Sequence, residues 1–166
     1  MAIDRTSKLA FAELQPQATQ ASAAGFLRRV LGQIPYKVQK LLTDNGIQFR
    51  TLPHHRHAGR HPVGQICDAW GIEQRFTKPA HPWANGQVER MNRTVKEATI
   101  KRFHYETTEQ LNQHLQTFLA AYNHAKRLKR LKGLTPYEYI CAEWRKSPAT
   151  FIRDPTQHPV GLSTSA

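Results

Sequence analysis

The order of strand-like and helix-like segments is the feature that most constrains the fold of this chain. Residues 2–14 are predicted to form two short strands about a turn, and residues 36–46 a strand that a Thr-Asp-Asn-Gly turn ends. A short helix expected at 63–71 separates that strand from another at 72–76, where apolar residues alternate. From residue 86 onward the apolar residues have helical spacing. Strands interleaved with helices, followed by a helical end, indicate an α/β or α+β domain.

Helices are predicted where apolar residues recur at three- and four-residue spacing behind a capping residue. Thr19 or Ser22 could begin a helix that runs through Leu31, and Gly32 and Pro35 would end it. Further helices are expected at about 86–104, 108–125 and 136–146, and the tail from Ser147 is expected to be extended.

The chain has 166 residues, enough for one domain with a buried core. Within it we distinguish 1–125, which carries the strands, from 126–166, a basic segment followed by a short helix and the tail. No apolar run reaches the roughly 18 residues of a membrane span, and the N-terminus lacks the apolar centre of a signal peptide. Cys67 and Cys141 lack metal-site spacing, so we expect buried free thiols in a reducing, cytoplasmic compartment.

The balance of charges points toward nucleic acid. Lys and Arg number 24 against 12 Asp and Glu, a net charge of +12. Over half of this excess lies in residues 90–146. The calculated pI of about 10.2 is in the range typical of nucleic-acid-binding domains. Ribosomal proteins, membrane-surface proteins and merely soluble proteins can have a similar balance, so charge alone does not decide the partner.

The helix that begins near residue 86 has two different faces. At about 100° per residue, Val88, Met91, Val95 and Ala98 form an apolar stripe. Glu89 lies on a second, polar stripe, and the other members of that stripe are Asn92, Arg93 and Lys96. The stripe places a carboxylate beside three groups that can hold phosphate oxygens. A solvated face with ordinary salt pairs, or a favourable charge at the helix N-terminus, would explain Glu89 equally well.

Asp44 stands where a predicted strand ends and a turn begins. Side chains that handle ligands gather at the carboxyl ends of strands in α/β sheets. An Asp-Asn-Gly sequence is also ordinary turn chemistry, so this position by itself leaves both interpretations open.

Three motifs together resemble a known family. "LLTDNGIQF" is followed by "HPWANGQVERMNRTVKE", with 44 residues between Asp44 and Glu89. "AAYNHAKRLKRLKGLTPYEYI" comes later in the chain. In wording and order these resemble the catalytic core of the retroviral-integrase and insertion-sequence transposase superfamily, whose members use a DDE trio of acids. The resemblance extends over nearly the whole chain.

The resemblance implies an RNase H-like fold, a mixed five-stranded sheet flanked by helices, in which two Asp and one Glu bind two divalent metal ions. Asp44 matches the second Asp of the trio and Glu89 the Glu, with a wider spacing than in the best-known members. Carboxylates suit Mg²⁺ or Mn²⁺. Two such ions can activate a water or 3′-hydroxyl and stabilise the leaving oxygen in phosphoryl transfer. In the family this reaction nicks the element ends and joins them to target DNA.

The resemblance also implies which residues face DNA. Asn92, Arg93 and Lys96 match positions near the scissile phosphate, and Asn85 and Gly86 match a mobile loop beside the active site. From the charge we expect further phosphate contacts from basic residues near the end of this helix and in the basic segment after the next one, namely Lys101, Arg102, Lys126, Arg127, Lys129 and Arg130.

The N-terminus departs from the family pattern. The first Asp of the trio belongs to a strand that precedes a hairpin, and Asp4 is the only Asp before Asp44. Residues 2–14 resemble the second and third strands of the family, so we interpret Asp4 as the Asp of the turn, with a metal-binding role as the weaker alternative. The first strand and its Asp are then missing, which leaves enzymatic activity uncertain.

Four histidines, His54, His55, His57 and His61, fall in one segment. They could bind zinc or nickel, but no cysteine is near and the spacing fits no standard finger, so a solvated loop is favoured. Trp83 could stack on a base or pack at the base of its loop.

The main functional prediction is a metal-dependent transposase or integrase core that acts on DNA as a homo-oligomer, without a membrane, in a bacterial nucleoid. The alternative is a catalytically dead remnant that only binds DNA. A weaker third possibility is a His-rich accessory protein that binds metal.

Overall fold

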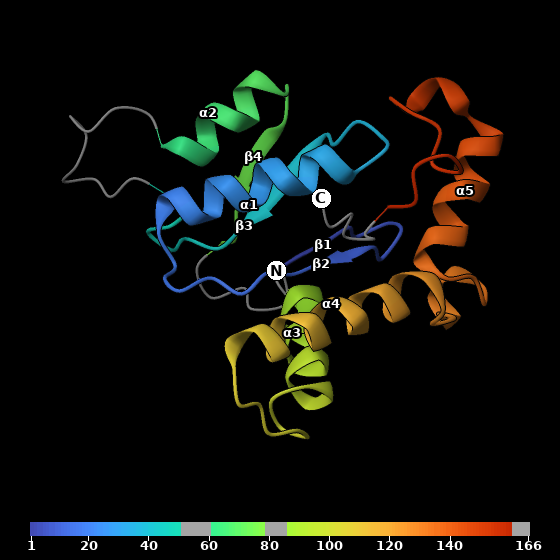
Figure 1. Cartoon of the computed structure of the whole chain (residues 1–166). Helices are drawn as coiled ribbons and strands as arrows, with labels where there is room; N and C mark the ends of the chain where they lie inside the picture. The colour runs from blue at the N-terminus through green and yellow to red at the C-terminus, as the bar shows by residue number, and fades with distance from the viewer. Residues whose placement is uncertain (51–60, 79–85, 161–166) are drawn as a thin grey trace. The chain divides into compact units, whose positions relative to one another are not determined.

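The computed structural model describes residues 1–50, 61–78 and 86–160 (Figure 1). The chain divides into two compact units whose segments alternate along the sequence. Unit 1 comprises Met1–Leu14, Gln33–Lys37 and Gln87–Ala166, and unit 2 comprises Gln15–Gly32 and Val38–Gly86. The division into 1–125 and 126–166 that we expected from the sequence stays a prediction.

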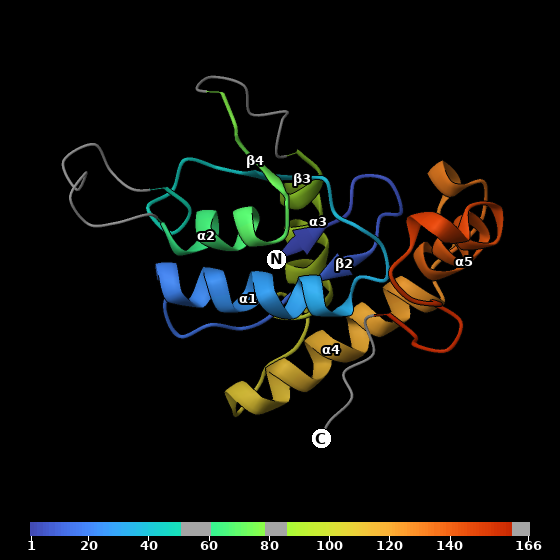
Figure 2. The ribbon, with the colours of Figure 1, turned by 90° about the horizontal axis from the view of Figure 1, so that it is seen from above.

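Unit 2 is built around a pair of parallel strands with a helix between them in sequence. Strands β3 (Lys40–Thr43) and β4 (Glu73–Phe76) pair in parallel, from Lys40 opposite Glu73 to Thr43 opposite Phe76. Because parallel strands need a crossover connection, helix α2 (Pro62–Ala69) lies between them in the chain. Helix α1 (Gln20–Gln33) lies beside α2 in both views (Figures 1 and 2). Their facing sides form the core of the unit, made of Ala24, Leu27, Leu31, Val63, Ile66, Cys67 and Ile72.

The helices of unit 2 begin at the capping residues that local chemistry favours. Thr19 caps α1, because its hydroxyl accepts from the Ser22 amide at 3.0 Å while the Thr19 amide donates to the Ser22 hydroxyl at 2.9 Å. His61 caps α2 through Nδ1, and Pro62 occupies the first helical turn, where its missing N–H costs nothing. Gly71 follows α2 with φ of +65°, a conformation that glycine adopts without strain.

Unit 1 combines a hairpin with the C-terminal helices. Strands β1 (Ala2–Ile3) and β2 (Ala10–Phe11) pair antiparallel, with Ala2 opposite Phe11. The helices are α3 (Gly86–Ala98), α4 (Thr108–His124) and α5 (Pro136–Lys146), with short 3-10 helices at Lys129–Leu131 and Pro148–Thr150. The core between the hairpin, α3 and α4 contains Ala10, Ala12, Met91, Leu115, Leu119 and Tyr122.

A fully buried amide fastens helix α4 to strand β2. Asn123 is 0 % exposed, and its side chain accepts from the Ala10 amide at 3.0 Å and donates to the Ala10 carbonyl at 2.9 Å. Gln116, seven positions earlier in α4, donates to the Ala12 carbonyl at 3.1 Å. The side chains of α4 therefore satisfy backbone groups on one edge of β2 that would otherwise be buried without partners.

The turn between α4 and α5 follows the basic segment. Lys132 and Gly133 both have positive φ, at 56° and 86°, which reverses the chain after Leu131. Thr135 then begins α5 with a reciprocal capping box, in which its hydroxyl accepts from the Glu138 amide and the Glu138 carboxylate accepts from the Thr135 amide.

Two boundaries expected from the sequence were wrong. The helix expected at about 86–104 ends at Ala98. Beyond it the Lys101 amide bonds to the Lys96 carbonyl, five positions back, and the Arg102 amide to the Thr99 carbonyl, three positions back, so the four-residue pattern of an α-helix is lost. The tail from Ser147 is not simply extended. It forms a 3-10 turn, and the Ile152 amide donates to the Pro35 carbonyl at 2.8 Å.

A mixed α/β architecture is confirmed for the described residues. These contain four strands in two separate pairs, one antiparallel and one parallel. Whether a further strand completes a larger sheet stays a prediction. Both cysteines, Cys67 and Cys141, are buried free thiols as expected. Among the described residues, no helix is both long and apolar enough to cross a membrane.

Candidate active site and nucleic-acid interface

Asp44 lies immediately after β3, with its side chain exposed. Its Oδ1 accepts from the Gly46 amide at 2.8 Å, which makes a local turn about Asn45. Within the described part of the chain, no donor bonds to Oδ2. Turn formation therefore uses one oxygen of the carboxylate and leaves the other available for a cation at the end of the strand.

Residues that follow Asp44 join this turn to the end of β4 by hydrogen bonds. The Asn45 side chain donates to the Thr77 carbonyl at 2.7 Å, and the Arg50 guanidinium donates to Asn45 Oδ1 at 3.3 Å. The same guanidinium lies over the Phe76 ring, 5.8 Å from its centroid. Asp44 is thus presented by a turn whose position is fixed by hydrogen bonds at the ends of both parallel strands.

Helix α3 has the two faces that its sequence predicts. Met91 is buried, and Val95 packs against the same core. Glu89 is exposed in the first turn of the helix. The other residues of the polar stripe, Asn92, Arg93 and Lys96, are exposed as well. No ion pair or hydrogen bond joins Glu89 to another described residue, so its carboxylate is free for a ligand.

Asp44 belongs to unit 2 and Glu89 to unit 1. The proximity of the two carboxylates that the motif pair implies therefore stays a prediction. Among the described residues, no group of three His, Cys, Asp or Glu side chains is assembled as a metal site. Each carboxylate nevertheless suits a hard divalent cation, because each is exposed and keeps an oxygen without a partner in the described part of the chain.

Asp4 lies in the turn of the hairpin, and both of its carboxylate oxygens are engaged. Oδ1 accepts from the Thr6 amide at 3.1 Å, and Oδ2 accepts from the Ser7 amide at 3.0 Å and the Ser7 hydroxyl at 2.5 Å. The Tyr36 hydroxyl also donates to Oδ2 at 2.8 Å. Burial, and secondarily the negative charge of Asp4, raises the pKa of Tyr36 well above its usual value. A metal ion at Asp4 would have to displace these donors.

The predicted basic residues are exposed but differ in how they are held. Arg127 donates to the Gly133 carbonyl at 2.9 Å and pairs with Glu138 at 3.3 Å, so it also closes the turn between α4 and α5. Lys126 lies over the Tyr122 ring at 5.8 Å. Arg102 lies over the Phe103 ring at 5.7 Å. The remaining cations of this group, Lys101, Lys129 and Arg130, are exposed.

Lys8 is a cation near α3 that the sequence did not single out. Its Nζ donates to the Arg5 carbonyl and to Gln87 Oε1, the latter at 3.3 Å. Burial lowers the pKa of Lys8, and the positive charges of Arg130 and Arg5 lower it further, while Asp4 opposes them. Lys8 lies in the hairpin turn, 79 positions before Gln87 in the chain. Its bond to Gln87 adds a positive charge at the start of α3, two residues before Glu89. Nothing in the local sequence marks this contact, which the structure forms from a turn where Lys8 has φ of 63°.

Several predicted residues lie outside the described part of the chain. They are Asn85, Trp83, His54, His55 and His57. Gly86 begins helix α3, and His61 caps α2 and is buried, so His61 is not part of a solvated loop. The predicted roles of the five residues outside stay predictions.

Comparison with known proteins relates this arrangement to integrases. The family model of the integrase core domain matches residues 70–136, which include β4, the polar stripe of α3 and the basic segment after α4. Among solved structures, the chain is similar to the catalytic core domain of BIV integrase in a crystal structure. The two chains are 26 % identical over 87 % of this chain and 86 % of that chain, with a TM-score of 0.64.

Proposed function

This chain belongs to the DDE transposase and integrase superfamily, and we propose that it is the DNA-processing core of a transposase, with Asp44 and Glu89 as two of its metal-binding carboxylates. The observation that carries the proposal is that both motif carboxylates are exposed and that each keeps an oxygen which no described residue engages. Neither carboxylate forms a salt bridge with a described residue, so neither has to give up such a partner to bind a cation. Glu89 in particular lies beside three side chains that could bind phosphate, those of Asn92, Arg93 and Lys96. Among the described residues it pairs with none of them.

The residues near Glu89 would bind the DNA backbone. Arg93 and Lys96 follow Glu89 by four and seven positions on the same face, and their charges attract phosphate oxygens. Asn92 adds amide donors that can orient a phosphate without adding charge. Bound at Asp44 and Glu89, two Mg²⁺ or Mn²⁺ ions would supply an activated nucleophile and stabilise the leaving oxygen.

A second proposal is that residues 1–166 by themselves bind DNA without cutting it. It is supported by Asp4, the one other Asp that precedes Asp44, because four donors already engage its oxygens. Two carboxylates offset only half of the charge of two divalent cations, and Mg²⁺ requires nearly ideal octahedral coordination. We therefore expect weak metal binding unless a third carboxylate joins Asp44 and Glu89, and we expect the functional form to be a homo-oligomer on DNA.

The test is Mn²⁺-dependent nicking of duplex DNA by the purified chain. We expect little nicking by residues 1–166, and metal-dependent nicking once an Asp-bearing strand is added ahead of Met1. In that extended chain, Asp44→Asn and Glu89→Gln should each abolish nicking, whereas Glu97→Gln, on the same helix, should not. Retained nicking in both single variants would refute the assignment of these carboxylates.

Nicking by residues 1–166 alone would distinguish the two proposals. If that activity disappears in Asp4→Asn as well as in Asp44→Asn, Asp4 fills the first position of the trio. The interpretation of Asp4 as only a turn residue would then be wrong, and so would the proposal of a chain that merely binds DNA.

A further inference from the structure

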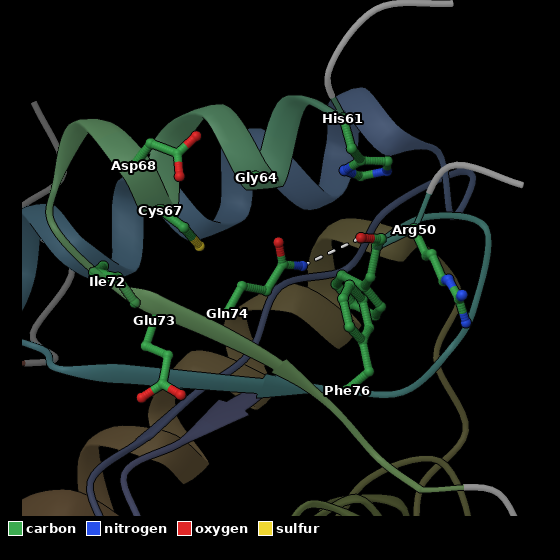
Figure 3. Close-up of a pocket in the computed structure, with 10 residues that line it drawn as sticks. Arg50, His61, Gly64, Cys67, Asp68, Ile72, Glu73, Gln74 and Phe76 are labelled. Atoms are coloured by element: carbon green, nitrogen blue, oxygen red, sulfur yellow. Dashed lines mark hydrogen bonds between the residues drawn. The ribbon is translucent and has the colours of Figure 1, made fainter. Parts of the chain in front are cut away.

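Unit 2 contains a cavity that the proposed catalytic role does not use. It has a volume of about 420 Å³ and lies between helix α2 and strand β4, with Arg50 at one end (Figure 3). All of its lining residues belong to unit 2, so its shape does not depend on where unit 1 lies. Cavities that hold small ligands measure about 300–1,000 Å³, which places this one at the size of a single nucleotide rather than a longer segment.

His61 gives the cavity a buried donor without an acceptor. The residue is 8 % exposed, and its Nδ1 accepts the Val63 amide hydrogen at 3.2 Å. In a neutral imidazole whose Nδ1 accepts, the proton is on Nε2. Nε2 is buried, and within the described residues it has no hydrogen-bond partner. Figure 3 shows the ring on the side of α2 that faces Gln74. Because an unpaired buried donor is unfavourable, a ligand that supplies an acceptor here would stabilise the site.

The two ends of the cavity differ in charge. Arg50 and Phe76 lie at one end, and Asp68 and Glu73 lie at the other (Figure 3). Glu73 pairs with Arg75 at 2.7 Å. A ligand phosphate would therefore lie toward Arg50, away from the two carboxylates.

The middle of the cavity offers groups that suit a flat, polar ring. Gln74 donates its amide nitrogen to the Phe49 carbonyl at 3.2 Å, which holds its Oε1 near Gly64 as an acceptor. His61 supplies the donor described above. The Phe76 ring, at the Arg50 end of the cavity, adds an apolar surface next to these groups, with 37 % of the residue exposed. Base edges combine acceptors and donors in this way, and aromatic side chains stack on their faces.

We propose that this cavity binds one unpaired nucleotide of the DNA, with its base near His61 and Gln74 and its phosphate near Arg50. This inference rests on the proposed function, because the DNA would be the substrate of the same chain. The position supports it: Arg50 bonds to Asn45, the residue next to Asp44. A nucleotide flipped out of the DNA duplex would thus lie beside Asp44, the carboxylate at which phosphoryl transfer is proposed.

Two variants change the cavity by different means. Gly64→Leu fills it, because a Cβ at Gly64 has only an ordinary contact with Gln74 Oε1 at 3.6 Å and the longer side chain extends into the cavity. Leucine is also the better helix former, so α2 is retained. His61→Asn keeps an acceptor for the Val63 amide while it withdraws Nε2. Gly32→Leu is the matched control, because nothing lies within 4 Å of a Cβ there and Gly32 is outside the cavity.

The first measurement compares the affinity of the full chain for a fully paired duplex with that for a duplex of the same length carrying one bulged thymidine. We expect about a tenfold preference for the bulge, the size of one base-stacking interaction. The preference should disappear in Gly64→Leu, fall severalfold in His61→Asn and persist in Gly32→Leu. If the chain binds both duplexes equally well, or if Gly64→Leu keeps the preference for the bulge, the cavity assignment is wrong. The proposed function is left intact in either case.

The second measurement does not require duplex binding. Deoxythymidine monophosphate, added at millimolar concentration, should shift the NMR signals of the His61 ring and the Gln74 side-chain amide, and Gly64→Leu should abolish those shifts. If these shifts occur but no duplex binds, DNA binding as part of the proposed function fails while the nucleotide site stands. If neither a bulge preference nor the shifts are found, the cavity does not bind nucleotides.

Discussion

The two units of this chain hold their candidate functional residues by contacts of different range. In unit 2, Asp44 is placed by a turn in which Gly46 and Asn45 make the decisive hydrogen bonds, within two residues or across the adjacent strand. In unit 1, the hairpin is held by Asn123 and Gln116, which bond to backbone more than 100 positions earlier. The Asp44 turn therefore combines one local bond with one bond to the end of the neighbouring strand, whereas the hairpin beside α3 depends on bonds between segments more than 100 positions apart.

The largest expected effects come from matched core substitutions, one in each unit. Leu31 in unit 2 and Leu119 in unit 1 are both 3 % exposed. Leu31→Ala and Leu119→Ala should each lower the free energy of unfolding by about 2–5 kcal/mol, because each removes buried methyl groups and leaves a cavity. Hydrogen exchange monitored by mass spectrometry should show the faster exchange mainly in the mutated unit. Equal acceleration in both units would mean that they unfold as one.

Asn123→Ala should have the next largest effect on stability, and it tests directly the bonds that join α4 to β2. It leaves the amide and the carbonyl of Ala10 buried without partners, which we expect to cost about 2–4 kcal/mol. Urea unfolding should detect the loss, and exchange should accelerate at 1–12 but not in α2. Gln113→Ala, at an exposed position of the same helix, is the control and should change stability by less than about 0.5 kcal/mol. A similar loss from both variants would show that the Ala10 bonds contribute nothing specific.

A smaller effect, visible only in alkali, is expected from Tyr36. Its raised pKa means that the unfolded chain ionises this phenol near pH 10 while the folded protein does not. Ionisation therefore favours the unfolded state, and the stability that Tyr36 contributes is complete below about pH 10 and falls above it. Urea unfolding between pH 8 and 11 should show that the stability difference between the wild type and Tyr36→Phe shrinks as the pH rises. A difference that is constant with pH would contradict this.

The smallest expected effect concerns DNA binding. It compares Lys96, for which no described residue is a side-chain partner, with Arg127, which bonds to Gly133 and Glu138. Lys96→Ala should weaken binding to unrelated duplexes alike and reduce the slope of log K against log salt by about one unit, because one phosphate contact is lost. Arg127→Ala should also lower stability, since Arg127 closes the turn before α5. Fluorescence anisotropy at several salt concentrations, with thermal unfolding in parallel, separates the two effects. A salt slope that Lys96→Ala leaves unchanged would exclude Lys96 from the interface.

The sequence predicted most elements because their signals are local. The cap at Thr19, the turn after β3 and the two-faced pattern of α3 depend on residues a few positions apart, and the structure confirms them. The expected end of α3 was wrong because no Gly or Pro follows Ala98 to mark a helix end in the sequence. After Ala98 the hydrogen bonds leave the α-helical pattern, and Phe103 packs edge-on against His114 of α4 at 5.0 Å.

By itself, the sequence determined the type and order of the elements, the turn at Asp44 and the exposed position of Glu89 beside Asn92, Arg93 and Lys96. Only the tertiary structure decided that Lys8 bonds to Gln87, that Asn123 completes the edge of β2 and that His61 points an unpaired donor into a cavity. The physical reason is the range of the interaction. Helical and turn patterns reflect neighbours within about four positions, whereas burial and hydrogen bonding between distant segments depend on how the chain packs.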